Sequence, residues 1–286
     1  MKNIDQDKLK EIISRFPQGK VLVLGDLILD EFVWGNVSRI SPEAPIPVVE
    51  VVKESFMPGG AANVSNNVQG LGGKVYLSGV IGADRGGDIL KEELSRRGIN
   101  ARGLIVDKGR PTTLKTRIIA HRQQVVRVDR EKKGPIGSSV FQNISTYCRE
   151  LVDGVDIVIV EDYGKGVVTG ELLDVLRRAK GKTIIVDPRL GSFSAYEGVD
   201  IITPNHHEAE VAVGKRIEDE ESLQESGKLL LENLRCQAVL ITLGEEGMCL
   251  FQQQGEVAHI PTVAREVYDV SGAGDTVVAT LSLALS

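Results

Sequence analysis

The chain of 286 residues is 42% hydrophobic and 26% charged, which is typical of a folded globular protein and excludes a disordered one. Its formal net charge of −6 argues against a nucleic-acid partner, because nucleic acids are polyanions. Three cysteines are too few for a disulfide scaffold and fit a reducing compartment. With no apolar stretch of about 20 residues and a charged, amphipathic N-terminal segment, we expect a cytoplasmic protein without a membrane segment.

Five short apolar, β-branched segments recur along the chain: residues 21–26, 74–82, 156–162, 182–188 and 238–244. Stretches between them, such as residues 169–181, carry Leu or Val at three- and four-residue spacing and end in basic residues and Gly, as helices do. This alternation predicts an α/β fold with a doubly wound, mostly parallel sheet and helices on both faces. Ligands in such folds bind beyond the carboxyl ends of the strands.

Two segments depart from this alternation. Residues 31–56 contain three prolines and no helical period, and residues 112–131 alternate apolar with polar or basic side chains. We expect them to form a small antiparallel sheet that projects from one main domain, which comprises residues 1–286. An exposed apolar sheet promotes aggregation unless it covers something, so we expect a lid over a site that could also pair with a second subunit.

A glycine-rich segment, VSGAGDTVVATLSLAL at residues 270–285, leads into an apolar helix. The backbone N–H groups of Gly272, Ala273 and Gly274 can converge at the positive end of the helix dipole, where phosphate oxygens bind well. Asp275 follows at the junction of loop and helix. It either accepts the proton of an attacking sugar hydroxyl or only caps the helix.

Polar residues near the first strand are candidates for binding a sugar. Gly59 and Gly60 permit a turn with positive φ, after which Asn63 can offer its amide to sugar hydroxyls. A tight turn that packs a helix against the sheet is the alternative. Asp26 and Asp30 follow the first strand and can accept hydrogen bonds from sugar hydroxyls, although Asp26 fits a turn cap equally well.

The segment TPNHHEAE at residues 203–210 combines an amide and a carboxylate one helical turn apart. Asn205 and Glu208 could hold a hydrated Mg²⁺ and phosphate oxygens. The adjacent His206 and His207 do not favour zinc, because neighbouring side chains on a helix diverge by roughly 100° and no third ligand is near in sequence.

Two further features each leave two interpretations open. Thr242 and Gly244 follow another predicted strand and could contact phosphates, or they form a simple turn. A run of basic residues between positions 110 and 130 is either a solvated face or attracts an anionic substrate. The run consists of Arg110, Lys115, Arg117, Arg122, Arg127 and Arg130.

In their order along the chain, these motifs resemble those of the ribokinase-like (PfkB) carbohydrate kinases. The shared motifs are Gly-Asp after the first strand, Gly-Gly-x-x-Asn, Asn-x-x-Glu, Thr-Leu-Gly and Gly-Ala-Gly-Asp. The likeness runs from about residue 21 to the C-terminus. Residues 38–51, 121–131 and 161–169 are similar to the branch that phosphorylates D-glycero-β-D-manno-heptose 7-phosphate, a precursor of the lipopolysaccharide core.

The resemblance implies an ATP- and Mg²⁺-dependent sugar kinase that could also use a monovalent cation. Asp275 would be the catalytic base, and Gly272, Ala273 and Gly274 would form the anion hole. The implied nucleotide contacts are Asn205, His206, His207, Glu208, Thr242 and Gly244, with Glu208 at the metal. The implied sugar contacts are Asp30, Gly59, Gly60 and Asn63.

In the heptose branch, the implied reaction transfers the γ-phosphoryl group to the anomeric hydroxyl and yields the 1,7-bisphosphate. The phosphate already on such a substrate needs a cationic anchor, for which we expect Lys165, Arg117 and Arg127. The lid further implies a homodimer. Alternatives are a kinase acting on fructose, ribose or a nucleoside, and a non-catalytic sugar- or nucleotide-binding module.

The C-terminal end differs from the family pattern. Family members usually continue for several tens of residues beyond the Gly-Ala-Gly-Asp motif, and those residues form a wall of the adenine site. Only 11 residues follow Asp275 here. We therefore expect a shortened C-terminal end that weakens adenine binding more than phosphate chemistry.

Overall fold

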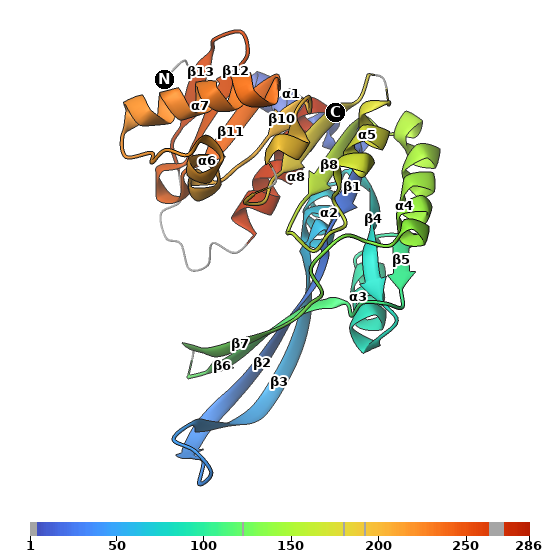
Figure 1. The fold of residues 1–286 in the computed structure, drawn as a ribbon, viewed down its shortest axis with the longest axis vertical. Helices are drawn as coiled ribbons and strands as arrows, with labels where there is room; N and C mark the ends of the chain where they lie inside the picture. The colour runs from blue at the N-terminus through green and yellow to red at the C-terminus, as the bar shows by residue number, and fades with distance from the viewer. Residues whose placement is uncertain (1–4, 122, 180, 192, 263–271) are drawn as a thin grey trace.

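The computed structural model of the chain describes residues 5–121, 123–179, 181–191, 193–262 and 272–286 (Figure 1). Arg122 of the basic run, and Val270 and Ser271 of the glycine-rich segment, lie outside these ranges. Within the described residues, no helix is both long enough and apolar enough to cross a lipid bilayer. All three cysteines are buried with free thiols.

The main sheet has nine strands in the order β13-β12-β11-β10-β9-β8-β1-β4-β5. The strands from β11 to β5 run parallel, and β12 and β13 add an antiparallel edge. The bounds are β1 Lys20–Gly25, β4 Lys74–Gly82, β5 Gly103–Asp107, β8 Ile157–Glu161, β9 Thr183–Asp187, β10 Ile201–Ile202, β11 Ala238–Thr242, β12 Met248–Gln252 and β13 Val257–Ile260. The predicted α/β class with a mostly parallel sheet is confirmed, and each of the five predicted segments contains a strand.

Helices cover both faces of this sheet because its strands are apolar on both faces. Within β1, Leu22 and Leu24 pack into the core on one face, and Val21 and Val23 pack into the core on the other. The first core includes α4 Ser138–Leu151, α5 Gly170–Arg177, α6 His206–Val213 and α7 Glu220–Leu234. The second includes α1 Gln6–Arg15, α2 Ala61–Gly70, α3 Arg85–Arg96 and α8 Ala273–Leu285.

A second sheet of four strands projects from this body and is called the projecting sheet below (Figure 1). Its order is β3-β2-β6-β7, with β2 Leu27–Ile40, β3 Pro47–Gly60, β6 Thr113–Ala120 and β7 Gln123–Arg130. The two predicted lid segments lie here. The prediction of a purely antiparallel sheet is wrong, because β2 and β6 pair in parallel. β6 enters from the main body after β5 and not through a hairpin with β2.

The order of the main sheet changes direction at β1. From β1 the chain passes to β4 and β5 on one side, and it later returns to β8 on the other side. Crevices form at such a switch point, outside the carboxyl ends of the two strands. Asp26 follows β1 there, and Glu161 is the last residue of β8. β2 also begins at this point, so the projecting sheet starts beside the crevice.

Candidate active site

The start of α8 offers backbone amides to an anion. Gly272 is the N-cap, with φ of 78°, and as glycine it has no side chain to cap the helix. Ala273 and Gly274 follow and are exposed, and the first N–H groups of a helix have no partner within it. A Cβ on Gly272 would lie 2.8 Å from the amide nitrogen of Asn63, so both the φ angle and this contact require glycine. The exposed N–H groups of Ala273 and Gly274 can therefore bind phosphate oxygens.

Asp275 is buried in the first turn of α8, beside these amides. Its Oδ2 accepts a 2.6 Å hydrogen bond from the side-chain amide of Asn63, and its Oδ1 accepts a 3.0 Å bond from the hydroxyl of Tyr163. The carboxylate is thus held by neighbours from α2 and from the loop after β8. It does not cap the helix, which was the alternative left open by the sequence.

Three effects, not all in the same direction, set the basicity of Asp275. Burial raises its pKa, the bonds from Asn63 and Tyr163 lower it, and the negative charge of Asp30 raises it again. The net direction is upward from the ordinary value for aspartate. A raised pKa makes the carboxylate a stronger base than an exposed aspartate, which suits removal of a proton from a hydroxyl.

Asp26 positions Tyr163. Its buried carboxylate accepts backbone N–H bonds from Tyr163 at 2.9 Å, Lys165 at 2.8 Å and Val167 at 3.2 Å. The residue therefore organises the turn after β8, as the turn-cap interpretation proposed. Burial raises the pKa of Asp26 to about 6.

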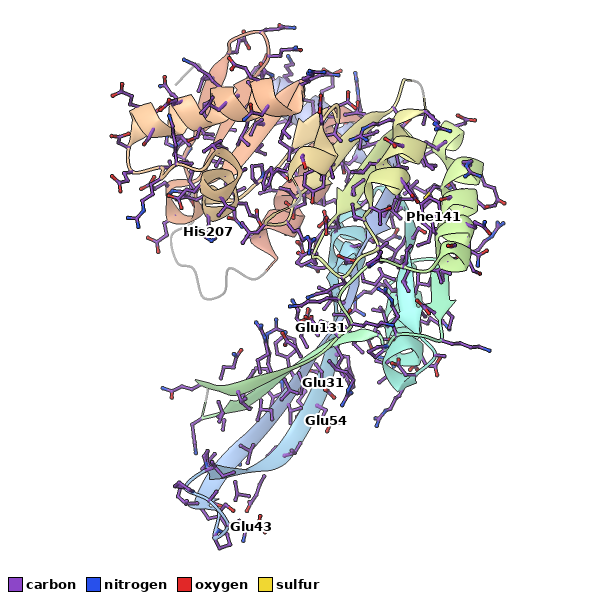
Figure 2. All side chains as sticks on the ribbon, in the orientation of Figure 1. Glu31, Glu43, Glu54, Glu131, Phe141 and His207 are labelled. Carbon is purple, nitrogen blue, oxygen red and sulfur yellow. The ribbon has the colours of Figure 1, made fainter. Side chains whose placement is uncertain are left out.

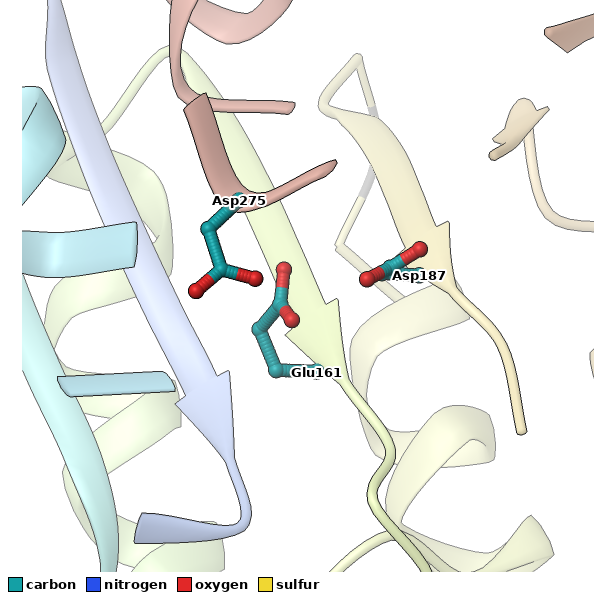
Figure 3. A group of neighbouring side chains, drawn as sticks. All are labelled: Glu161, Asp187 and Asp275. Atoms are coloured by element: carbon teal, nitrogen blue, oxygen red, sulfur yellow. The ribbon is translucent and has the colours of Figure 1, made fainter. Parts of the chain in front are cut away.

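Three carboxylates meet at the carboxyl ends of β8 and β9 and the start of α8 (Figure 3). One oxygen from each of Glu161, Asp187 and Asp275 lies within 4.8 Å of the others. Glu161 is fully buried, and neither of its carboxylate oxygens has a hydrogen-bond partner among the described residues. Asp187 accepts a 3.0 Å hydrogen bond from the hydroxyl of Thr203.

The electrostatics of this cluster suit a divalent cation. Burial and the charges of Asp187, Asp275 and Asp26 raise the pKa of Glu161 well above its ordinary value. Burial and the charge of Glu208 raise the pKa of Asp187 to about 8. A cation would offset this repulsion and give the unbonded oxygens of Glu161 a partner, and carboxylate oxygens are hard ligands of the kind Mg²⁺ prefers.

Asn205 and Glu208 are occupied with each other. Asn205 Oδ1 accepts a 2.9 Å bond from the N–H of Glu208, and Glu208 Oε2 accepts a 2.8 Å bond from the N–H of Asn205. This capping box starts α6. Glu208 lies close enough to raise the pKa of Asp187 but is not one of the three clustered carboxylates. Thr242 forms a β-bridge with Asn205, and Gly244 follows with φ of 60°.

The two histidines contact Ile217, beyond the end of α6, and Glu210, within it, and not the carboxylate cluster. The ring of His206 lies 2.9 Å from the carbonyl oxygen of Ile217. His207, labelled in Figure 2, is largely exposed and lies 3.6 Å from a carboxylate oxygen of Glu210. A direct role for either ring at the metal therefore has no geometric support.

The predicted sugar contacts converge beside Asp275. Asp30 on β2 forms an ion pair of 2.5 Å with Arg117 on β6. Gly59 leaves no room for a side chain, because a Cβ there would overlap the carboxylate of Asp30. Gly60, with φ of 57°, is the N-cap of α2, and this helix carries Asn63 to the carboxylate of Asp275.

The three predicted phosphate anchors already have carboxylate partners. Arg117 pairs with Asp30, as described above. Lys165 Nζ lies 2.5 Å from Glu131, which Figure 2 labels near the junction of the projecting sheet and the main body. Arg127 bonds to both oxygens of Asp129, at 2.9 and 3.0 Å.

The sequence did not point to Glu161, Tyr163 or Asp187 as residues of this site. It also did not single out Lys115, which contacts the ring of Tyr163. The rule that polar residues beyond strand ends are candidates applies to Glu161 and Asp187, since both end strands. For Tyr163 the available signal was its place in the EDYGKGVVT motif. Lys115 was noted only as one member of a basic run.

Comparison with known proteins identifies the family. The family model "pfkB family carbohydrate kinase" matches residues 18–286. The chain is 46% identical over 277 residues to "Bifunctional protein HldE" of Desulfatibacillum aliphaticivorans, covering 96% of this chain and 57% of that protein. It is also 46% identical over 268 residues to the protein of the same name from Geobacter sulfurreducens, covering 93% and 55%. The chain thus spans less than two thirds of the length of these relatives.

Solved structures show the same fold. Ribokinase from Arabidopsis thaliana, complexed with ribose and ATP, superposes with a TM-score of 0.73 at 19% identity, covering 93% of this chain and 85% of that one. Phosphofructokinase-2 from Escherichia coli, in complex with substrates and products, gives 0.73 at 19% identity, covering 93% and 86%. The chain therefore belongs to the pfkB family of carbohydrate kinases.

Proposed function

We propose that the chain transfers the γ-phosphoryl group of ATP to the anomeric hydroxyl of D-glycero-β-D-manno-heptose 7-phosphate, giving the 1,7-bisphosphate. The observation that carries this proposal is the buried carboxylate of Asp275, held by Asn63 and Tyr163 beside exposed amides at the start of α8. Phosphoryl transfer to an alcohol requires at least a base for the hydroxyl proton and a site that binds the phosphate.

In the proposed reaction, Asp275 accepts the proton of the anomeric hydroxyl as the sugar oxygen forms its bond to the γ-phosphorus. The bond between that phosphorus and the bridging oxygen breaks, and ADP leaves with the electron pair. The N–H groups of Ala273 and Gly274 stabilise the negative charge on the transferring group. Asn63 and Tyr163 keep the carboxylate oriented toward the acceptor.

Glu161 and Asp187 fit a bound Mg²⁺, because their carboxylates adjoin the anion site and Glu161 has no hydrogen-bond partner in the part of the chain that the structure describes. Mg²⁺ would there neutralise charge on the phosphates of ATP. The sequence predicts Glu208 as a metal ligand. We propose that it lies beside Asp187 and acts on the metal site through its charge. Thr242 and Gly244 remain proposed phosphate contacts.

The heptose substrate is supported by the motifs of residues 38–51, 121–131 and 161–169 and by relatives named HldE at 46% identity. We propose that the projecting sheet acts as the lid of this site. Asp30 and Arg117 lie on this sheet, and Asp30 is close enough to Asp275 for its charge to raise the pKa of that residue. A cytoplasmic location is proposed because all three cysteines are reduced and buried.

Kinetics of Asp275→Asn test the proposal. The variant keeps the shape of the side chain but cannot accept a proton, so kcat should fall by about 10²- to 10⁴-fold. Asp153→Asn, which removes an exposed carboxylate from the opposite end of the sheet, is the matched control and should keep full activity. Phosphoryl transfer should be assayed with heptose 7-phosphate, fructose 6-phosphate, fructose and ribose.

The outcomes separate the alternatives. Turnover of fructose or ribose without turnover of heptose 7-phosphate would refute the heptose substrate and leave the kinase class. Equal inactivity of the parent chain and Asp275→Asn on every sugar would favour a binding module.

A further inference from the structure

The register of the projecting sheet places a group of charged side chains on one face. Lys115 on β6 lies opposite Asp30 on β2 and opposite Asp129 on β7. Arg117, two residues further along β6, lies opposite Arg127. Because side chains alternate between the faces of a strand, these residues point to the same side of the sheet.

This face looks toward the proposed base. Lys115 Nζ lies 5.7 Å from the centroid of the Tyr163 ring, and the hydroxyl of that ring bonds to Asp275. Lys115 and Asp275 therefore contact the same side chain, that of Tyr163. The side chain is half-buried, so the ammonium group is only partly hydrated.

Lys115 differs from the other cations around it in having no acidic partner. Arg117, Arg127 and Lys165 each have a carboxylate oxygen within 3 Å. Across the described ranges, no carboxylate oxygen lies within 4.0 Å of Lys115 Nζ. The ammonium group instead lies over the ring of Tyr163. A half-buried ammonium without a counter-ion is unfavourable unless something else neutralises it.

Neighbouring positive charges make this arrangement more costly. Burial, followed by the charges of Lys165 and Arg127, lowers the pKa of Lys115 below its usual value, despite the opposing charges of Asp30 and Asp129. An anion bound at this point would relieve the repulsion among three cations at once. A phosphate dianion fits best, because it can accept hydrogen bonds from several donors and carries the larger charge.

We infer that Lys115 anchors the phosphate group already present on the sugar substrate, flanked by Lys165 and Arg127, and so selects phosphorylated over neutral sugars. The inference rests on the proposed function and names its specificity residue. Asp275 and Lys115 would hold opposite ends of one substrate, the acceptor hydroxyl and the distal phosphate. A neutral sugar would leave Lys115 as unpaired as it is here.

The test compares Lys115→Met with Lys53→Met. Methionine keeps the length of the side chain and removes the charge, and Lys53 is an exposed lysine on β3 of the same sheet. For the phosphorylated sugar, Lys115→Met should raise KM, and Kd from calorimetric titration without ATP, by about 10- to 100-fold, the loss of one charge-assisted bond. kcat should change less than about threefold, and Lys115→Arg should restore part of the affinity. Lys53→Met should match the parent.

Each other result overturns the inference. An equal loss of kcat on phosphorylated and neutral sugars would mean that Lys115 acts through Tyr163 on Asp275. An equal rise of KM in Lys53→Met would mean a bulk charge effect.

The parent chain separates this inference from the proposed function. If it phosphorylates fructose 6-phosphate and not heptose 7-phosphate, the heptose substrate fails and the anchor is tested on fructose 6-phosphate. If it accepts neutral sugars only, both proposals fall.

Discussion

Tyr163 connects the two halves of the site at the level of single residues. Its backbone N–H is fixed by Asp26 at the switch point of the sheet, its hydroxyl bonds to Asp275, and its ring lies under Lys115. One side chain therefore contacts both the proposed base and the proposed phosphate anchor. Its removal should disturb the base in a way that the pH dependence of activity reports.

Tyr163→Phe should move the acidic limb of the kcat/KM profile to higher pH. The hydroxyl donates to the charged form of Asp275 and so lowers its pKa; without this bond the pKa rises. Because the base must be deprotonated, activity then appears only at higher pH, by about one to two units for one bond to a charged group. The pH profile of Tyr147→Phe, on the distant α4, should coincide with that of the parent. A limb that stays in place, or moves to lower pH, would contradict this role.

Glu161 allows a test of metal binding that does not depend on activity. Mg²⁺ that binds the folded state raises the free energy of unfolding by about 2.7 kcal/mol at 100 times its Kd. Glu161→Gln removes a charge from the cluster of three carboxylates, so Mg²⁺ should raise the melting temperature of this variant less than that of the parent. Without Mg²⁺ the variant should be at least as stable as the parent, because repulsion with Asp187 and Asp275 is relieved. Calorimetric melting with and without Mg²⁺ measures both effects, and an equal Mg²⁺ shift in the two proteins would exclude Glu161 as a ligand.

At the scale of elements, the turn from β3 into α2 depends on Gly60. Its φ of 57° is unfavourable for other residues, and a Cβ would lie 2.5 Å from the carbonyl oxygen of Asp26. Gly60→Ala should lower the free energy of unfolding by about 1–3 kcal/mol and displace Asn63 from Asp275. Gly70→Ala, at the end of the same helix where a Cβ has open space, should be neutral or stabilise by up to about 1 kcal/mol. Urea unfolding of the two variants compares them directly, and equal stabilities would show that the turn is not strained.

The elements were predictable from the sequence where one local pattern dominates. β1, β4, β8, β9 and β11 are continuous apolar strands, and their pattern gave both their type and their layer. Strands β5, β10, β12 and β13 were not predicted; β10 has only two residues, and β13 is exposed along its length. The parallel pairing of β2 with β6 follows from the path of the chain, which a local pattern does not contain.

The site was predictable in part for the same reason. A turn that needs glycine is visible locally, so Gly60 and Gly272 were found, and Asp275 was found from the loop that precedes α8. The bond from Tyr163 to Asp275 joins residues 112 positions apart in the chain. Such a contact depends on strand order and side-chain direction together. The carboxylate cluster was missed because its members lie on three separate elements.

At the scale of the whole molecule, the two sheets supply different groups of the site. The main sheet places Asp26, Glu161 and Asp187 at the carboxyl ends of its strands, and α8 adds Asp275. The projecting sheet brings Asp30 and the cations. β2 leaves the switch point directly, so the acidic and basic halves of the site adjoin although the net charge of the chain is −6. The acidic half suits a metal and a proton, and the basic half suits an anionic substrate.

The opposite face of the projecting sheet bears on assembly. Val126 and Val128 point away from the cations and are 45% and 49% exposed. An apolar sheet face of this kind is unfavourable in water, and stable interfaces bury about 1,000 Å² or more.

The homodimer through the lid therefore remains a prediction with a definite test. Sedimentation at micromolar concentration should show a dimer for the parent and a monomer for Val126→Asp/Val128→Asp, since two buried charges oppose association. Val211→Asp, an equally exposed valine on α6, should stay dimeric. A monomeric parent would refute the dimer, and dissociation of both variants would place the interface elsewhere.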